Sequence, residues 1–398
     1  MVVKNPVLPS AEQARAAAGA PVPVLAYPAL MEWIERERPD IVLLSASGPV
    51  VAALTAAPLL RGPDRPVLVT GLPGISVPAT PRGIRYRAGC DVFLLHSHRE
   101  IAEFTALAAE LGVPHRFGLA RLPFLPPGPP ATIDPPADGP LVFAAQAKVP
   151  VLREEREQIL LALARAGSAV VKLRALSTEL QTHHEPWPYP QLYARLVQAG
   201  RLEPDALRFA AGSMTEALAG ARGLVTVSST AALEAMASGL PVLVLGDFGV
   251  SAEMINLVFV GSGAIGTLAD LADGRLPVTD PAWTAANYFH PAADNTWLSL
   301  VDERLALRRD GGLPTLPPLS DSRWIQTRRR LRLTWSPAVW RRLRTLRIAV
   351  RRVQGRIAPA PLPVLPDGSA PAAPLAGPPA GHQPPPSASP PPPSDPGR

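Results

Sequence analysis

The stretch that decides the fold is GLVTVSSTAALEAMASGLPVLVLGDFG, residues 223–249. Residues 224–227 are mostly apolar and mostly β-branched, which predicts a buried strand, and residues 231–238, most of which are small, predict a helix. Gly239 ends that helix. Pro241 cannot continue it, and residues 242–245 predict a second buried strand. The stretch therefore predicts a parallel βαβ unit with a hydroxyl-rich turn between its first strand and its helix.

This turn predicts a phosphate site. Ser228, Ser229 and Thr230 supply hydroxyls beside a helix N-terminus, whose free N–H groups and partial positive charge favour an anion. Glu234 lies four residues after Thr230, on the same helix face, where a carboxylate can accept hydrogen bonds from a ribose. The alternative is that the hydroxyls only cap the helix and Glu234 is an exposed charge. The small residues of the helix allow close packing on the sheet and favour the nucleotide interpretation.

The segment SSTAALEAMASGLPVLVLG, residues 228–246, resembles the nucleotide-binding segment of GT-B-fold glycosyltransferases and of their relatives, the UDP-sugar 2-epimerases and polyol-phosphate transferases. Over residues 1–310 the chain is similar to an actinobacterial-type family of glycosyltransferase-like proteins. The resemblance implies that Ser228, Ser229 and Thr230 hold the diphosphate of a nucleotide-sugar donor and that Glu234 holds its ribose. The motif is specific for the fold and weak for the reaction.

Composition sets the class of protein. The chain has 398 residues and 47% hydrophobic content, enough for two domain cores. Its net charge of +6 comes from the C-terminal part, because residues 321–398 have 13 basic and 3 acidic side chains and residues 1–320 have 26 and 30. A single cysteine, Cys90, excludes an intramolecular disulfide and a multi-cysteine metal site. With no signal-peptide pattern in the first ten residues, we expect a cytoplasmic protein.

Alternating strands and helices predict an α/β fold of two Rossmann-like domains that face a cleft. We expect the first, acceptor-side domain over residues 1–124, a linker rich in Pro and Gly over 125–140, and a nucleotide-sugar-binding domain over 141–310. The predicted strands are 41–45, 67–70, 92–96, 141–145, 169–173, 224–227 and 242–245, and the predicted helices are 10–19, 31–37, 50–57, 99–111, 153–166, 191–198, 231–238 and 295–308.

The start of the chain lacks the strand and glycine-bearing turn with which a Rossmann-like half usually opens. We therefore expect the first βα unit to be missing from this sequence and an apolar sheet face or edge to be exposed.

The C-terminal part contains two segments. We expect residues 311–356 to form a basic helical segment, since 12 Arg with three Trp lie between Arg323 and Arg356. Two interpretations remain open: a helix docked across the first domain, or a helix on an anionic membrane surface. Nucleic acid is the third choice, since nothing else in the chain fits a nucleic-acid-binding fold. Residues 357–398 include 16 Pro in 42 residues, which predicts a disordered tail.

Further candidates follow the predicted strands. In the second domain Lys148, Lys172 and Arg174 stand where strand ends deliver cations to a diphosphate, although each also fits a surface residue beside a strand. The resemblance implies that Lys172 faces the donor. The run His183-His184-Glu185 is weak evidence for a metal, because neighbouring residues rarely converge on one ion.

In the first domain Gly71 and Gly74 lie on a loop that faces the cleft, and His96 or Glu100 could be the base for an acceptor hydroxyl. The plainer alternatives are that His96 only ends a strand and that Glu100 is a first-turn charge. The sequence has no Asp-x-Asp, so we expect neither a metal nor another cofactor.

These observations predict a metal-independent GT-B-like glycosyltransferase that moves a sugar from a nucleotide-sugar donor to a cell-envelope, glycan or lipid-linked acceptor. The alternatives are a UDP-sugar 2-epimerase-like or polyol-phosphate transferase enzyme and a non-catalytic nucleotide-sugar-binding protein. An epimerase requires acidic residues around the sugar from both domains, and the sequence does not identify them.

Overall fold

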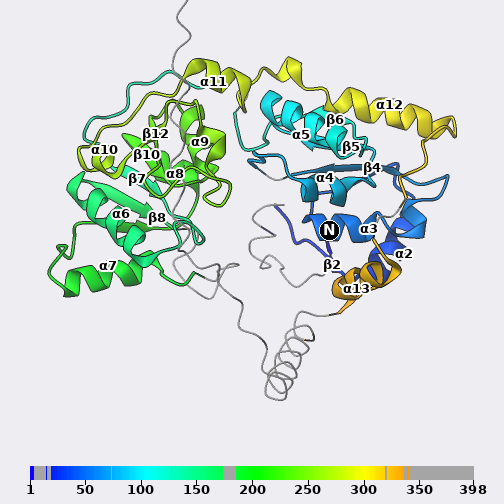
Figure 1. Cartoon of the computed structure of the whole chain (residues 1–398), viewed down its shortest axis with the longest axis horizontal. Helices are drawn as coiled ribbons and strands as arrows, with labels where there is room; N and C mark the ends of the chain where they lie inside the picture. The colour runs from blue at the N-terminus through cyan, green and yellow to red at the C-terminus, as the bar shows by residue number, and fades with distance from the viewer. Residues whose placement is uncertain are drawn as a thin grey trace, which may run out of the picture. The chain divides into compact units, whose positions relative to one another are not determined.

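The computed structural model describes residues 1–3, 15, 19–72, 74–126, 128–173, 185–318, 321–335 and 339. They form an α/β structure with two large parallel sheets and a small pair of strands (Figure 1). The predicted fold class is confirmed. Most of the predicted helix over residues 10–19, most of the basic segment beyond residue 335 and the whole Pro-rich tail lie outside the described residues.

The first sheet has four parallel strands in sequential order, β3-β4-β5-β6. Its strands are β3 (Ile41–Leu44), β4 (Val67–Gly71), β5 (Val92–Leu95) and β6 (Phe117–Leu119). The helices and the 3-10 turn around it are α2 (Tyr27–Glu37), α3 (Gly48–Leu54), η1 (Pro58–Leu60), α4 (Pro81–Arg87) and α5 (His98–Glu110).

Sequential strand order determines how this sheet is covered. Right-handed crossovers between consecutive strands place their helices on one face, and α2 to α5 pack on the face that contains Leu68 and Phe93. The opposite face, with Val67 and Val92, is covered by α12 (Trp297–Arg309). The sequence predicted this helix as part of the second domain; it packs on the first because the crossovers leave that face bare.

The start of the chain forms a small sheet of its own, beside the four-stranded sheet. β1 (Val2–Val3) pairs in parallel with β2 (Val24–Leu25) as a separate two-stranded sheet. β3 is the outer strand of the four-stranded sheet, and its side chains Ile41 and Leu43 are 40% and 61% exposed.

The second sheet has six parallel strands in the order β12-β11-β10-β7-β8-β9. Its strands are β7 (Leu141–Ala144), β8 (Ala169–Lys172), β9 (Arg208–Ala210), β10 (Gly223–Thr226), β11 (Val242–Leu245) and β12 (Ile265–Gly266). The helices and 3-10 turns around it are α6 (Arg153–Arg165), α7 (Tyr189–Gln198), α8 (Met214–Leu218), α9 (Ala231–Ala237), η3 (Leu257–Phe259), α10 (Leu268–Ala272), α11 (Pro281–Ala286) and η4 (Ala292–Asp294).

Here the strand order reverses at β7, so the helices cover both faces. Alternate residues of the central strands enter two separate cores: Val142 and Leu224 pack with α8, α9 and α11, whereas Phe143 and Val225 pack with α6, α7 and α10. This is the doubly wound arrangement in which the point of reversal leaves a crevice at the carboxyl ends of the strands.

The Pro- and Gly-rich segment 125–140 lies against the end of α9. The N–H of Ala131 donates to the carbonyl oxygen of Ala237. Gly239 ends α9 with φ +78°, as predicted, and a Cβ there would come within 2.4 Å of the Ala131 carbonyl oxygen. Only glycine satisfies both the left-handed backbone and this close approach.

Within the basic segment, α13 (Arg323–Thr334) packs on α2 and α3. Leu333 is buried in the core of the first sheet, and Arg330 Nη2 donates to the Ala56 carbonyl oxygen at 2.6 Å. For these residues the docked interpretation is confirmed. Among the described residues, no helix combines the length and apolar character needed to cross a bilayer.

Candidate functional site

A pocket of about 510 Å³ opens at the point of strand reversal in the second sheet. β7 and β10 are neighbours there, and the chain leaves their carboxyl ends through residues 145–149 and 228–230. Parallel strands deliver the residues that follow them to one edge, so two segments far apart in sequence meet. The pocket is lined by Ile75, Ala144, Ala145, Gln146, Ala147, Lys148, Val149, Lys172, Leu173, Glu185, Gly212, Met214, Ser228, Ser229, Thr230, Ala231, Glu234 and Ile255.

The hydroxyl turn has a different role for each side chain. Ser228 is buried and its Oγ donates to the Ile255 carbonyl oxygen at 2.5 Å. Ser229 Oγ accepts from the N–H of Ala231, which leaves its own proton available to a ligand. Thr230 is the N-cap of α9 and makes no capping hydrogen bond with its side chain within the described chain.

The expectation of free N–H groups at the start of α9 needs correction. The N–H of Ala231 donates to Ser229 Oγ, that of Ala232 to the Ser229 carbonyl oxygen and that of Leu233 to the Thr230 carbonyl oxygen. The turn folds back on its own carbonyls because Thr230 is helical, with φ −60° and ψ −18°. These three N–H groups are therefore paired within the turn, whereas Ser229 and Thr230 line the pocket.

Glu234 and Lys172 supply opposite charges to the same pocket. Burial raises the pKa of Glu234, and the Lys172 ammonium opposes that rise. Burial lowers the pKa of Lys172, against the attraction of Glu234 and Glu216. Lys172 Nζ donates to the Leu173 carbonyl oxygen at 2.9 Å, which holds the ammonium at the end of β8.

The remaining candidates of this domain follow β7 and β8. Lys148 is exposed at the pocket wall. Gln146 Oε1 is buried without a hydrogen-bond partner in the described part of the chain, so it can accept from a ligand. Arg174, and the two histidines of the predicted His-His-Glu run, lie outside the described residues.

Arg156 shapes this wall, and the sequence analysis missed it. Its side chain is fully buried and donates to the carbonyl oxygens of Gln146, Ala147, Pro150 and Trp187, and it pairs with Glu185 at 2.5 Å. A detectable signal existed, because Arg156 stands on the apolar face of α6 three, four and seven residues before Ile159, Leu160 and Leu163.

A loop of the first domain reaches the same pocket. Ile75 is one of the lining residues, and a Cβ on Gly74 would lie 3.1 Å from Thr230 Cγ2. Gly74 has φ +72°, which favours glycine. Gly71 ends β4, four residues before Ile75, and is not among the described lining residues.

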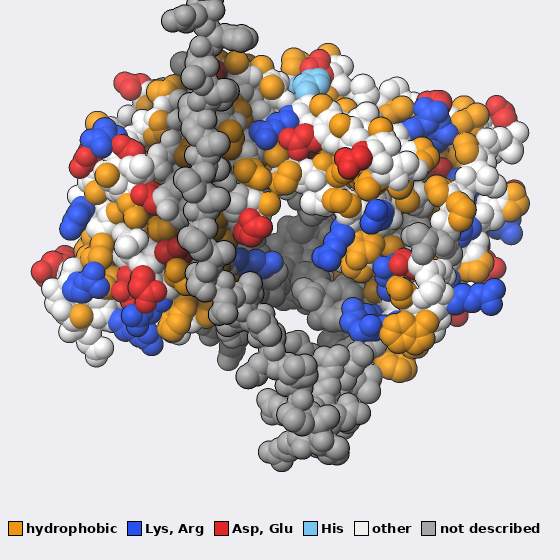
Figure 2. Space-filling model, in the orientation of Figure 1, with side chains coloured by type: hydrophobic (Ala, Val, Ile, Leu, Met, Phe, Trp, Pro, Cys, Tyr) orange, Lys and Arg blue, Asp and Glu red, His pale blue; other side chains and the backbone are white. Residues whose placement is uncertain are grey.

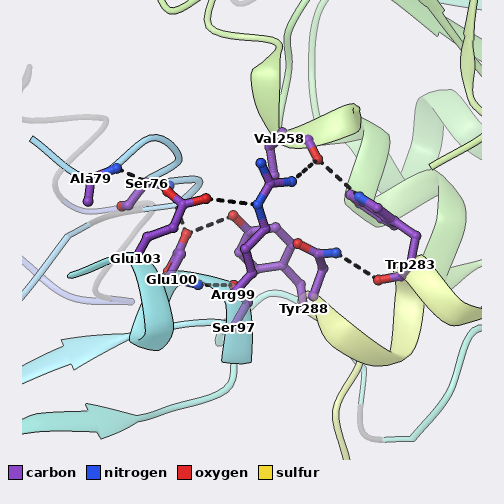
Figure 3. Close-up of polar contacts among 10 residues, drawn as sticks. Ser76, Ala79, Ser97, Arg99, Glu100, Glu103, Val258, Trp283 and Tyr288 are labelled. Carbon is purple, nitrogen blue, oxygen red and sulfur yellow. Dashed lines mark hydrogen bonds and ion pairs between the residues drawn. The ribbon is translucent and has the colours of Figure 1, made fainter. Parts of the chain in front are cut away.

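His96 and Glu100 have structural partners. The Glu100 carboxylate is fully buried and accepts from the Ser76 N–H at 2.8 Å and from Tyr288 Oη at 2.7 Å (Figure 3). It also accepts from the N–H of His96 at 2.8 Å. The ring nitrogens of His96 lie 2.7 and 2.9 Å from the carbonyl oxygens of Ala120 and Leu72. Neither residue is among the described residues that line the pocket.

The first turn of α5 joins the loop of the first domain to the second domain (Figure 3). Glu103 accepts from the Ala79 N–H and from Arg99 Nε. Arg99 Nη1 donates to the Val258 carbonyl oxygen, which also accepts from Trp283 Nε1. Three side chains of one helical turn thus fix residues 76–79 and contact two segments of the second domain.

The described residues contain no group of three or more His, Cys, Asp or Glu side chains placed to hold a metal ion. The polar groups that converge on the pocket are ammonium, carboxylate, amide and hydroxyl. Such a set suits a ligand with both anionic oxygens and neutral hydroxyls.

Comparisons with known proteins give the following matches. A family model described as "Putative glycosyltransferase (DUF6716)" matches residues 1–304. No curated protein sequence matches. In structure the chain is similar to the pneumococcal O-GlcNAc transferase GtfA in complex with UDP and GlcNAc, with 12% identity and a TM-score of 0.39 over 79% of this chain and 58% of that chain.

Two further solved structures are similar. For the accessory secretory protein 1, 2 and 3 structure from Streptococcus pneumoniae, identity is 14% and the TM-score 0.36, over 72% of this chain and 53% of that chain. For Anabaena HepE in complex with UDP and glucose, identity is 12% and the TM-score 0.41, over 75% of this chain and 89% of that chain. The chain spans little more than half the length of the two streptococcal proteins.

Proposed function

Because the chain belongs to the family described as "Putative glycosyltransferase (DUF6716)", we propose that it is a GT-B-like enzyme that transfers a sugar from a nucleotide-sugar donor. The observation that supports this most is that Glu234, Lys172 and the hydroxyl residues Ser229 and Thr230 line one pocket at the strand reversal. A carboxylate, a cation and hydroxyl donors at one edge match the ribose and diphosphate of such a donor.

Glu234 is the ribose ligand in this proposal. A half-buried carboxylate can accept hydrogen bonds from both ribose hydroxyls, and hydrogen bonds to a charged group contribute about 1.5–3 kcal/mol. Lys172 and the exposed Lys148 bind the diphosphate, and Ser229 and Thr230 donate to it. With two ammonium groups available, the proposed transfer needs no metal ion.

The acceptor approaches from the first domain in this proposal, past the loop that includes Gly74 and Ile75. We place the reaction in the cytoplasm, where a cell-envelope, glycan or lipid-linked acceptor meets the donor at the inner face of the plasma membrane. His96 and Glu100 would have to leave four backbone partners and Tyr288 to act on an acceptor, so we assign neither as the general base.

Isothermal titration calorimetry with UDP, GDP, ADP and the matching nucleoside monophosphates tests donor recognition. We expect one diphosphate to bind more tightly than its monophosphate, since the second phosphate adds contacts with Lys172 and Lys148. A donor-hydrolysis assay with the corresponding nucleotide sugars then tests turnover. Binding without turnover in the presence of acceptor extracts would instead support a non-catalytic nucleotide-sugar-binding protein. If none of the nucleoside diphosphates bound, the proposed donor recognition would be contradicted.

A further inference from the structure

Helix α13 has one face fixed to the first domain. Leu333 is 3% exposed among the side chains of α2 and α3. Arg330 Nη2 donates to the Ala56 carbonyl oxygen, and its guanidinium lies 5.9 Å from the ring centroid of Tyr27. Arg329 pairs with Asp321 and lies 5.2 Å from the ring centroid of Tyr86. These contacts determine which side of the helix points outward.

The outward side presents apolar and basic groups together. Trp324, Arg328 and Leu331 follow the spacing i, i+4, i+7 and so form one stripe. Trp324 is 65% exposed, Ile325 beside it is 36% exposed and Leu331 is 36% exposed. The Arg328 guanidinium lies 5.4 Å from the Trp324 ring centroid. Figure 2 shows hydrophobic and basic side chains side by side over α13, at the lower right of the view.

The charge of this segment has one sign. Residues 322–356 include 12 Arg and no acidic residue. Asp321, just before the helix, is paired with Arg329 on the docked side. The outward Arg323 and Arg328 therefore belong to a strongly cationic stretch. A partner that complements it must itself be polyanionic.

We propose that the outward face of α13, defined by Arg323, Trp324, Ile325, Arg328 and Leu331, binds the surface of an anionic lipid bilayer. A bilayer interface supplies phosphate groups for the guanidinium groups, a headgroup layer that favours the indole ring, and an apolar boundary for the two aliphatic side chains. A nucleic acid supplies phosphates, but it has no apolar phase for Ile325 and Leu331. The combination of the two chemistries on one stripe favours lipid.

The geometry gives this surface a functional consequence. Because α13 is docked on α2 and α3, lipid binding would hold the first domain, the proposed acceptor side, at the bilayer. The inference does not depend on the identity of the donor or on transfer activity. Vesicle binding can therefore succeed or fail independently of nucleotide binding.

The test is co-sedimentation of the full chain with vesicles of phosphatidylcholine alone and of phosphatidylcholine with 30% phosphatidylglycerol, at about 0.05 and 0.5 M salt. The test variant combines Trp324→Ala, Arg328→Gln and Leu331→Ala. The matched control combines Leu298→Ala and Arg309→Gln, an exposed aliphatic residue and an exposed Arg of α12. Thermal unfolding checks that both variants fold, as expected for exposed and half-buried positions.

We expect the wild type and the control to bind the anionic vesicles at low salt and to bind at least tenfold more weakly at high salt. The α13 variant should bind at least tenfold more weakly than the control at low salt. Equal binding by the variant and the control would overturn the proposal, since the lipid site would then lie elsewhere, for example in residues 340–398. Absence of vesicle binding by the wild type, or displacement of the wild type from vesicles by a short RNA at equal phosphate concentration, would also overturn it.

Discussion

Arg156 both stabilises the fold and holds the wall of the pocket in place. It has a buried positive charge, and its partners are the Glu185 carboxylate and four carbonyl oxygens, several of them in the segment that follows β7. A buried ion pair adds little net stability over an apolar pair of the same size, but removing one partner leaves the other charge buried and unpaired. Arg156 is therefore costly to replace even though it does not line the pocket.

We predict that Arg156→Gln lowers the free energy of unfolding by about 3–5 kcal/mol. The loss has two sources, an unpaired Glu185 and unsatisfied carbonyl oxygens. The control is Arg165→Gln, an exposed Arg on the same helix, which should change stability by less than about 0.5 kcal/mol. Urea unfolding of both variants measures the difference. Equal effects would show that the buried contacts of Arg156 do not stabilise the fold.

Glu234 should separate ligand binding from stability. Its pKa is raised, so the folded state binds a proton more tightly than the unfolded state. The ionised carboxylate therefore costs stability at neutral pH, and this cost disappears as the pH falls through the raised pKa. We predict that Glu234→Gln keeps or slightly raises the melting temperature, because the cost of the buried charge is removed. The lost attraction between Glu234 and Lys172 offsets part of this gain.

The same variant should bind the preferred nucleoside diphosphate about 1–3 kcal/mol more weakly, because an amide replaces a charged acceptor of the ribose hydroxyls. In the wild type this binding should weaken as the pH falls through the raised pKa of Glu234. Calorimetry at several pH values measures both effects, with Glu203→Gln, an exposed carboxylate, as the control. Unchanged affinity of Glu234→Gln would contradict the ribose assignment.

The sequence predicted part of this site because parallel strands bring the residues that follow them to one edge. Ser229, Thr230, Glu234, Lys148 and Lys172 were placed in this way. The sequence analysis failed for side chains whose positions depend on contacts with residues distant in the sequence. A polar residue on an apolar helix face, such as Arg156, indicates that the side chain has buried partners, but the sequence does not show which residues these partners are. The buried positions of His96 and Glu100 depend on a loop and a tyrosine distant in sequence.

At the scale of elements, α9 and α5 show how single turns fix loops. Helix α9 ends at Gly239, where the Ala131 carbonyl oxygen of segment 125–140 leaves no room for a Cβ. Helix α5 begins after Ser97, its N-cap, whose Oγ accepts from the N–H of Glu100. Both turns hold a segment that has no regular structure of its own. Their contributions can be measured separately.

We predict that Gly239→Ala is more destabilising than Gly200→Ala. Both glycines follow a helix with positive φ, +78° and +67°, so each alanine pays a similar backbone cost of about 1–2 kcal/mol. At Gly200 a new methyl group meets nothing within 4 Å among the described residues, whereas at Gly239 it comes within 2.4 Å of a carbonyl oxygen. Chemical unfolding should show at least about 1 kcal/mol between the two variants. Equal free energies of unfolding for the two variants would mean that segment 125–140 moves aside at no cost to make room for the methyl group.

The contact between Tyr288 and Glu100 gives a second prediction at this scale. Tyr288→Phe keeps the ring and leaves a buried carboxylate with two of its three donors, so we expect a loss of about 1–3 kcal/mol. Tyr193→Phe is the control, because Tyr193 Oη contacts neutral backbone groups: it donates to the Glu203 carbonyl oxygen and accepts from the Leu207 N–H at 3.3 Å. It should cost about 0.5–1.5 kcal/mol or less. Urea unfolding distinguishes the two. A smaller effect at Tyr288 than at Tyr193 would contradict the structural role of this contact.

Element prediction succeeded for the long periodic segments. The helices over 153–166 and 99–111 and all seven predicted strands occur, with ends shifted by at most one residue. It missed β6, β9 and β12, which have three, three and two residues, because so short a run gives no periodicity to detect. It also misplaced α12, since an apolar face is visible in the sequence but the surface that it covers is not.

At the scale of the whole molecule, the chain returns from the second sheet to the first. After α12, the segment before α13 is held by Arg61 and Arg65, which donate to the carbonyl oxygens of Leu316, Pro317 and Pro314. Arg308 of α12 pairs with Asp40 at 2.5 Å. Arginines of both parts thus donate to backbone carbonyl oxygens of the other, since Arg330 of α13 donates in turn to the Ala56 carbonyl oxygen.

The last prediction concerns truncation after residue 320. Removing residues 321–398 exposes the apolar surface that Leu333 covers, including Ile34, Val51 and Leu54. Fully burying one such side chain contributes about 1.5–3 kcal/mol, so we expect at least that loss in the free energy of unfolding. The loss should be nearly the same at 0.05 and 0.5 M salt, because buried apolar contacts are not screened as exposed charges are. Removing residues 340–398 alone leaves all the described contacts of α13 in place and should retain the stability of the full chain. If the longer truncation were as stable as the full chain, or lost stability only at low salt, α13 would be held by exposed charges rather than by the packing of Leu333.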